Sequence, residues 1–457
     1  MDPALGIAAS SLDAATTAIA VTSENIANAN TPGYVNETAQ MAAIPGGGML
    51  GVGDGVQVTD ISLANNALLA TNNWQAQGAL ANLGSLQQMA TAIEDVFPLG
   101  TGTIGSSTGA TDNSLAGQLA NFWSSWDGIA TSPSSLAPRT QVVDMAQGLA
   151  STLNQAATQL TQLSSNSVAQ LGDQVSQVNA LLTQAAALNQ SIVRTEGAGA
   201  STNQLTDQMN NVVGQLSQLV GANAQMQSNG TADINVGGIT LVQGSQADTL
   251  SMTVTAGTAS VVAQPGGVTV PVSGGSVAGL LLGVNQYIPE YQNQLNGVAN
   301  ALATTVNTQL AAGYTASGVS GATEPLFVGT GAAGIAVNSA VAADPTLIAA
   351  ATTTGPGAVN DGSNAQAMAE LGTVSTGPDA AYQNLVQGIG TLTQGLNSQV
   401  ASQTAVANQA NQSLQAVTGV DQNTQLTNLL QFQQVYQASA KLLSIVDAAI
   451  QSLMAAV

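Results

Sequence analysis

The sequence predicts a mainly helical protein with a small inserted antiparallel β unit, an α+β fold whose two ends form paired helices. Three observations lead to this prediction. Apolar residues recur every three or four positions over long segments in both halves of the chain. Between residues 222 and 276 the period changes to two, which indicates strands. The first and last segments share one three-then-four rhythm, which is typical of a coiled-coil seam.

At 457 residues the chain is longer than one typical domain, so we expect several. Residues 1–35 with 420–457 are predicted to form a terminal coiled-coil domain. An elongated helical bundle, built from both halves of the chain, is predicted for residues 36–221 with 277–419. It contains a Gly- and Pro-rich outer segment near 313–377, which is either a reduced outer domain or a loop. Residues 222–276 are the inserted β unit.

The two terminal helices are expected to carry the assembly seam. Its larger side chains are Leu5, Leu12, Ile19 and Ile26 in the first helix and Leu429, Phe432, Tyr436, Leu443, Val446, Ile450 and Leu453 in the last. So narrow a stripe buries little apolar surface. The free energy gained by this burial is small compared with the conformational entropy lost when two long helices become ordered. We therefore expect the ends to be mobile in the monomer and to become ordered when neighbouring subunits cover them.

A turn motif ends the first helix, and it consists of Asn28, Asn30, Thr31, Pro32, Gly33 and Tyr34. Pro32 disfavours the helical conformation at Thr31, and Gly33 permits a positive φ. The Asn side chains compete for backbone hydrogen bonds. A Gly-rich stretch, 45–55, follows and is expected to be extended or a hairpin.

The interior alternates between helices and turn signals. Helical patterning covers 115–219 with breaks at 132–135 and 197–201, as expected for an antiparallel bundle. In the β unit, residues 233–236 and 239–242 flank Gly237-Gly238, which is typical of a two-residue hairpin turn. Further strands are expected around 250–254 and 268–272, and the remaining helices at 279–312, 380–416 and 424–455.

Charge and composition exclude several classes of function. Charged residues make up only 6% of the chain, the net charge is -21, and Arg139, Arg194 and Lys441 are the only basic side chains. Nucleic-acid and anionic-lipid binding depend on clustered Lys and Arg, so neither is expected. No uninterrupted apolar run reaches about 18 residues, so no membrane insertion is expected. The start of the chain lacks the features of a cleaved signal peptide.

Catalysis and cofactor binding are not expected either. The chain has no Cys and no His, which excludes disulfides, Ser-His-Asp triads and the usual zinc sites. Two segments, 100–105 and 329–334, match G-x-G-x-x-G, but 49 glycines make chance matches common. An enzyme that uses paired carboxylates remains an alternative, although nothing in the spacing of the acidic residues suggests one. The sequence predicts no enzyme, no metal and no cofactor.

The residues at both ends resemble a known family. Segments 10–15 and 26–34 resemble the amino-terminal signature of bacterial flagellar axial proteins, which include rod, hook and hook-associated proteins. Segment 429–443 is similar to the carboxy-terminal signature of the hook-associated protein 1 family. Interior segments are similar to the same family in the same order, namely 123–155, 204–221, 229–242 and 274–314.

This resemblance implies a secreted structural protein at the junction of flagellar hook and filament, exported unfolded by the flagellar type III apparatus. It implies four partners: further copies in a tubular assembly, the hook protein, a second hook-associated protein, and an export chaperone at the carboxy-terminal helices. Two alternatives remain open. A hook or distal rod subunit shares the end motifs, and a secreted surface fibre or adhesin would represent another class.

Overall fold

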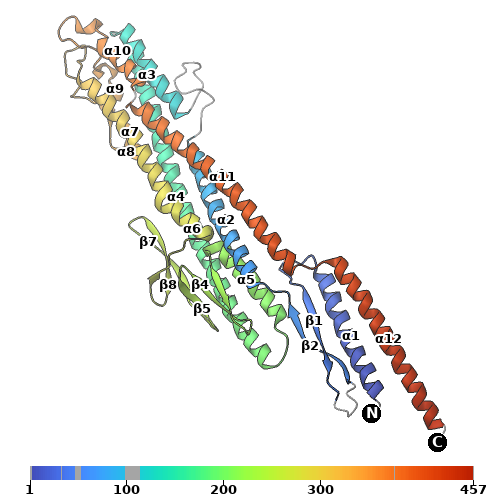
Figure 1. The fold of residues 1–457 in the computed structure, drawn as a ribbon. Coiled ribbons are helices and arrows are strands. Elements are labelled where there is room, and N and C mark those ends of the chain that lie inside the picture. The colour runs from blue at the N-terminus through green and yellow to red at the C-terminus, as the bar shows by residue number, and fades with distance from the viewer. Residues whose placement is uncertain (1–2, 32, 47–52, 98–113, 375, 456–457) are drawn as a thin grey trace.

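The computed structural model describes residues 3–31, 33–46, 53–97, 114–374 and 376–455, apart from the side chains of Pro3 and Leu453. It confirms a mainly helical fold with small antiparallel sheets. The molecule is elongated, and both chain ends lie together at one extremity (Figure 1). The main helices are α1 (Pro3–Asn28), α2 (Ala67–Glu94), α3 (Leu115–Thr131), α4 (Leu136–Gly197), α5 (Asn203–Val220), α6 (Gly275–Leu282), α7 (Ile288–Ala311), α11 (Pro378–Thr418) and α12 (Gln422–Ala455).

The terminal helix α1 lies between α12 and a hairpin of β1 (Glu37–Ile44) and β2 (Gly55–Leu63), as Figure 1 shows. The Ser10 hydroxyl accepts a hydrogen bond from the Val56 amide at 3.3 Å, which fastens the hairpin to α1. The sequence placed residues 36–63 with the helical bundle, whereas this hairpin packs on the terminal helix. We call α1, the turn, the hairpin and α12 together the terminal unit. The domain limits given above stay a prediction.

By length and mean hydropathy, α1 resembles a membrane-spanning helix. Its segment Ala4–Asn28 contains an 18-residue window of mean hydropathy 1.5, and no other helix among the described residues passes this test. Asp13 and several Ser and Thr residues interrupt the apolar run, which is why counting uninterrupted residues predicted no span. The buried residues of α1 include Ala8, Ala15 and Ala18, so one side of the helix packs on protein.

The rest of the molecule is built on α4, which is 62 residues long and runs the length of what we call the body, residues 64–419. Helices α5, α6, α7 and α2 contact α4, and α11 packs on α2 and α7. Asn66 caps α2 by accepting from the Leu69 amide, and Ser114 caps α3 through the Gly117 amide. At the crossing of α6 and α2, a Cβ on Gly279 would lie 2.6 Å from the Asn82 carbonyl oxygen, so this crossing requires glycine.

The inserted β unit consists of two small antiparallel sheets beside α4. The first contains β3 (Asn223–Met226), β4 (Ala232–Val236), β5 (Ile239–Gln243) and β6 (Gln246–Ala247), and the second contains β7 (Thr249–Thr255), β8 (Thr258–Gln264) and β9 (Val268–Thr269). The predicted hairpin is present, and Gly237 and Gly238 both have positive φ. Strand β8 was not predicted, and the strand expected at 268–272 is reduced to β9.

Four helical asparagines attach strands to the bundle in one repeated way. Each side-chain oxygen accepts from the backbone N–H of a single strand residue, and each side-chain NH2 donates to the carbonyl of that same residue, at distances of 2.7 to 3.1 Å. The pairs are Asn189 with Ala232, Asn179 with Leu250, Asn285 with Ala259, and Asn307 with Phe327. We call these contacts the asparagine bridges.

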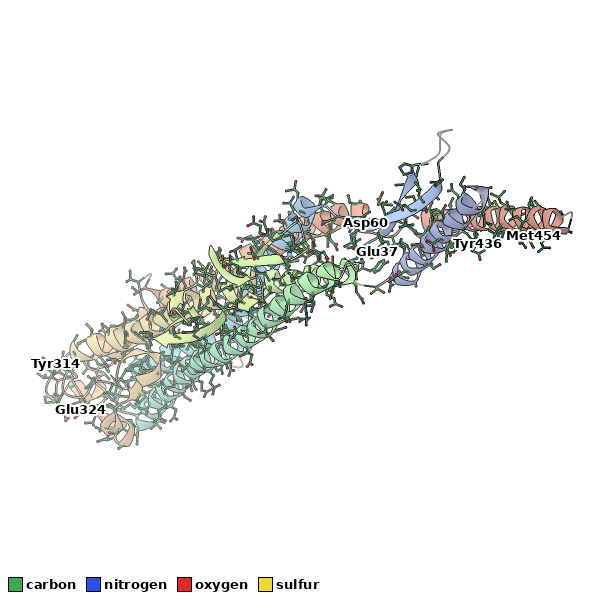
Figure 2. The ribbon with its side chains drawn as sticks, turned by 90° about the horizontal axis from the view of Figure 1, so that it is seen from below. Glu37, Asp60, Tyr314, Glu324, Tyr436 and Met454 are labelled. Carbon is green, nitrogen blue, oxygen red and sulfur yellow. The ribbon has the colours of Figure 1, made fainter. Side chains whose placement is uncertain are left out.

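The segment after α7 forms a packed cap on the end of the bundle, which we call the outer cap (residues 313–374). Tyr314 and Glu324 mark this end in Figure 2, remote from Tyr436 and Met454 on α12. Its side chains join the bundle core, where Phe327 lies 5.9 Å from Phe122 between ring centroids. The outer cap contains β10 (Phe327–Val328), α8 (Gly331–Gly334), β11 (Ala336–Val337), α9 (Ser339–Ala343) and α10 (Ser363–Glu370). It is neither a loop nor a domain with a separate core.

Candidate assembly surface and joint

Helix α12 leaves an unusual amount of apolar surface uncovered. Helix α1 contacts it along one face, where Gln425 and Ser439 are buried. Along its length α12 nevertheless exposes nine large apolar side chains: Leu426, Leu430, Val435, Tyr436, Leu442, Leu443, Ile445, Ile450 and Met454. Exposed apolar side chains in this number on one helix indicate an interaction site. We call it the α12 apolar surface.

The predicted seam residues are divided between the contact of α1 with α12 and this surface. In α1, the four large positions Leu5, Leu12, Ile19 and Ile26 are half-buried, while the small residues Ala8 and Ala15 between them are buried. In α12, Leu429, Phe432 and Val446 are half-buried, whereas Tyr436, Leu443 and Ile450 are 36 to 39% exposed. Leu453 lies outside the described side chains. The seam is therefore only partly used within one chain.

A hydrogen-bonded centre around Asn25 joins the four parts of the terminal unit. The Asn25 side-chain oxygen accepts from the Glu37 amide and the Tyr34 hydroxyl, both at 2.9 Å. Its NH2 group donates to the Glu37 carbonyl and to the Gln425 side chain. Gln425 donates in turn to the Asn36 side chain at 3.0 Å. Because Asn25 and Gln425 are almost fully buried, these bonds fix the relation of α1, turn, hairpin and α12.

The turn motif forms the compact reversal that its residue types predict. The Thr31 amide donates to the Asn28 carbonyl, and the Tyr34 amide donates to the Thr31 carbonyl. Gly33 has a φ of +81°, and Asn30 and Thr31 are exposed. Burial raises the pKa of the Tyr34 hydroxyl, and the nearby carboxylates of Glu37, Glu24 and Asp207 raise it further. Pro32 lies outside the described residues.

A cleft of about 830 Å³ separates this turn from the body and defines what we call the joint. The turn, the first part of α2, one face of α5 and the end of α11 line it, and ten of the 27 lining residues are Asn or Gln. Asp207 of α5 projects into it and is only 9% exposed. Burial raises the pKa of Asp207 to about 7, a hydrogen bond from the Val35 amide lowers it, and Glu37 raises it.

The motifs considered for metal and nucleotide binding can be located in the structure. The described residues contain no group of three or more Asp, Glu, Cys or His side chains that could hold a metal ion. Of the two G-x-G-x-x-G matches, 329–334 forms a single helical turn after β10, and 100–105 lies outside the described residues. Sequence reasoning missed Asn25, Asp207 and Gln425. Their residue types are too common in this chain to single them out.

Comparisons with known proteins match both regions of the chain. Residues 102–327 match the family described as flagellar hook-associated protein FlgK helical domain. Residues 5–34, which include α1 and the turn, match the flagella basal body rod protein family.

Several curated proteins are similar to this chain along most of its length. "Flagellar hook-associated protein 1" of Escherichia coli (strain K12) is 29% identical over 337 residues, covering 70% of this chain and 59% of that protein. The protein of the same name from Salmonella typhimurium gives the same values. The Bacillus subtilis protein of that name is 26% identical over 497 residues, covering 95% of this chain and 94% of its own. The chain thus spans 59% of the length of the first two and nearly all of the third.

A solved structure has a related fold. The flagellar hook junction protein FlgK from Burkholderia pseudomallei superposes with a TM-score of 0.62 at 19% sequence identity. The match covers 77% of this chain and 100% of the solved one. This similarity supports the fold of the elongated body.

Paired terminal helices, a rod-type amino-terminal segment and a long helical body with a β insertion define a flagellar axial protein. Together with the match to the helical domain and the similarity to the three curated relatives, they assign the chain to one branch of that class. It belongs to the FlgK family of flagellar hook-associated proteins.

Proposed function

We propose that this chain is a structural component of the bacterial flagellum, outside the cell, at the junction between hook and filament. Its copies assemble there through their terminal helices into a tube. The observation that carries this proposal is the α12 apolar surface, which stays uncovered after α1 has packed against α12. The names of the similar proteins, hook-associated protein 1 and hook junction protein, support the same role.

The proposed mechanism is mechanical rather than catalytic. The terminal units of neighbouring copies pack side by side and bury Leu430, Leu442, Ile445 and the exposed part of the seam. The body extends away from them, because both chain ends lie at one extremity of an elongated molecule (Figure 1). The predicted seam residues act in two groups, one inside the pair and one between subunits.

The proposed partners follow from this arrangement. Other copies flank each subunit, the hook protein lies on one side of the ring, and a second hook-associated protein lies on the other. Before assembly the α12 apolar surface would associate non-specifically, so an export chaperone bound to the carboxy-terminal helices would keep the chain soluble. The absence of cysteine suits export of an unfolded chain, because no disulfide forms on the way.

Two alternatives share part of this support. A hook or distal rod subunit would have similar terminal helices, but the match of residues 102–327 to the FlgK helical domain favours the junction role. A secreted fibre or adhesin would be favoured by strands that repeat at a fixed period. The two described sheets of the β unit differ in strand number and length.

Deleting the gene and imaging the cells by electron microscopy distinguishes these proposals. A junction protein gives complete hooks without attached filaments, and the gene on a plasmid restores the filaments. Loss of the hook itself would instead identify a hook or rod subunit. Normal filaments together with altered surface attachment would support the fibre alternative and refute the flagellar role.

A further inference from the structure

The terminal unit is held to the body by very little structure at the joint. The chain crosses the joint twice, at residues 64–66 and at 419–421. Two backbone bonds accompany the crossings: Asn36 donates to the Thr418 carbonyl and Ala64 donates to the Asn36 carbonyl, both at 2.9 Å. Short connections with few packed side chains are where hinge motion is absorbed in proteins.

The remaining attachment across the joint comes from one face of α5. Asn203, Asp207 and Asn211 are spaced four residues apart and therefore lie in a row. Asn203 donates to the Ile61 carbonyl of β2 at 2.7 Å, and Asp207 accepts from the Val35 amide at 3.4 Å. The Asn211 side chain lies against Gly33, where a Cβ would displace it. We call this row the α5 latch.

Asp207 is the unusual member of the latch, because it is buried with incomplete hydrogen bonding. One carboxylate oxygen is at the long distance of 3.4 Å from its donor, and the other has no hydrogen-bond partner. A buried carboxylate in this state is costly when charged, whereas the protonated acid is tolerated. Asn73 of α2, which also lines the cleft, has a buried side-chain oxygen without a partner.

The charged groups around Asp207 increase this cost. Glu37 of β1, on the terminal unit, raises the pKa of Asp207, whereas Glu24 of α1 raises the pKa of Glu37 and of the Tyr34 hydroxyl. Asp421, from the crossing between α11 and α12, lines the cleft. Helices α2 and α11 contribute only uncharged residues to the described lining, and no basic side chain from any element is part of it. The Asp207 carboxylate therefore faces the like charge of Glu37, with no compensating cation in the described lining.

We propose that the α5 latch is a proton-operated hinge, in which protonation of Asp207 holds the terminal unit against the body and deprotonation releases it. The charged form draws water into the cleft and is repelled by Glu37, so the Val35 contact is lost. The uncharged form stays buried beside the turn. The angle between the terminal unit and the body then depends on pH, through a group that the proposed assembly role does not need.

The direction of the effect follows from linkage. The closed joint raises the pKa of Asp207 to about 7, whereas an open, hydrated joint leaves it near the ordinary value of about 3.9. Closure is therefore fully favoured below about pH 4, is weakened progressively between about pH 4 and 7, and is least favoured above pH 7.

The absence of cysteine makes a distance measurement on the full chain straightforward. Gln57→Cys on β2 and Gln190→Cys on α4 place one spin label on each side of the joint, at exposed positions. Pulsed electron resonance at pH 5 is expected to give one narrow distance. At pH 8.5 a second, broader distance appears, with at least a tenfold rise in the open-to-closed ratio and a midpoint near pH 7.

Matched variants identify the responsible group. Asp207→Asn keeps the shape of the side chain without its titration, so the narrow distance should persist at both pH values. Glu37→Gln removes the like charge that raises the pKa of Asp207 and should lower the midpoint, while Asp60→Asn, exposed on the hairpin, should leave it unchanged. Circular dichroism confirms folding, and the Glu37→Gln midpoint remains a test if Asp207→Asn does not fold. A parent distance independent of pH, or a pH response that survives Asp207→Asn, overturns the proposal.

Discussion

Replacing Ile445 by Asp tests whether the α12 apolar surface binds neighbouring subunits. Ile445 is 57% exposed in the monomer, so a neighbour can bury the larger part of its side chain. Fully burying an isoleucine stabilises by about 1.5–3 kcal/mol, so the exposed part offers roughly 1–2 kcal/mol to the interface. Burying a carboxylate in its place costs several kcal/mol more. Each subunit contact should lose about 4 kcal/mol, which is about a thousandfold in association.

The same substitution should hardly affect the monomer. The part of Ile445 that α1 and α12 already bury contributes only about 1 kcal/mol, so helicity and thermal unfolding of the purified chain should change little. The assay is complementation of a deletion strain, scored by swimming and by filaments attached to hooks. Ile445→Asp should fail to complement, and Ile445→Ala should complement partially.

Two controls separate the causes. Gln437→Asp adds the same charge to an exposed polar position of α12 and should complement. Phe432→Ala alters a half-buried position of the same helix and should weaken the terminal pair in the monomer itself. Full complementation by Ile445→Asp, with an unchanged monomer, would refute the assignment of this surface to assembly.

Three further predictions concern the body. Asn189→Ala should lower the free energy of unfolding by about 3 kcal/mol or more, because the N–H and C=O of Ala232 lose a buried partner. Chemical denaturation measures this, and an unchanged free energy of unfolding would contradict the bridging role. Gly84 of α2 faces open space, so Gly84→Ala should stabilise the protein by about 0.5–1 kcal/mol. Gly279 of α6 lies at the tight crossing with α2, so Gly279→Ala should destabilise it by about 1–3 kcal/mol. Equal shifts of the melting temperature would show that the crossing is not tight. Hydrogen bonds from Ser363, Thr352 and Thr353 hold the pKa of Asp361 well below its usual range, so the stabilisation that this carboxylate gives to the local structure around Thr352 should be fully present above about pH 4 and weaken progressively as the pH falls further. Hydrogen exchange of the Thr352 amide measures this, and a protection factor that does not fall between pH 5 and pH 2 would exclude it.

The helices of the fold were predictable because apolar spacing and breakers agree along most of the chain. Helix α11 was expected at 380–416 and is Pro378–Thr418, where Pro378 begins it. The turn between β4 and β5 was predictable because Gly-Gly is one of the few pairs that adopt two positive φ values readily.

Strand β8 could not be predicted, because the turn that precedes it does not follow the usual residue preferences. Its hairpin with β7 turns at Ala256-Gly257, and both residues have positive φ, which alanine rarely adopts. Strand β1 was missed because Ala, Gln and Glu dominate it, and these residues have low strand propensity. The bulge between Gln40 and Met41 further breaks its alternation.

Only part of the candidate site could be predicted from the sequence. The seven-residue spacing identified the stripe, yet Leu442 and Ile445 fall outside it and became visible only when α1 was seen to cover one face of α12. The joint could not be predicted from the sequence, because Asp207 and Val35 are 172 positions apart and no local pattern links them.

The asparagine bridges have a consequence for the medium in which the molecule works. Salt screens interactions between ions, whereas hydrogen bonds between neutral amides are not weakened in this way. In a chain with 6% charged residues, strands fastened by Asn179, Asn189, Asn285 and Asn307 keep their attachment from fresh water to brine. A part exposed to whatever water surrounds the cell thereby holds its shape without depending on salinity.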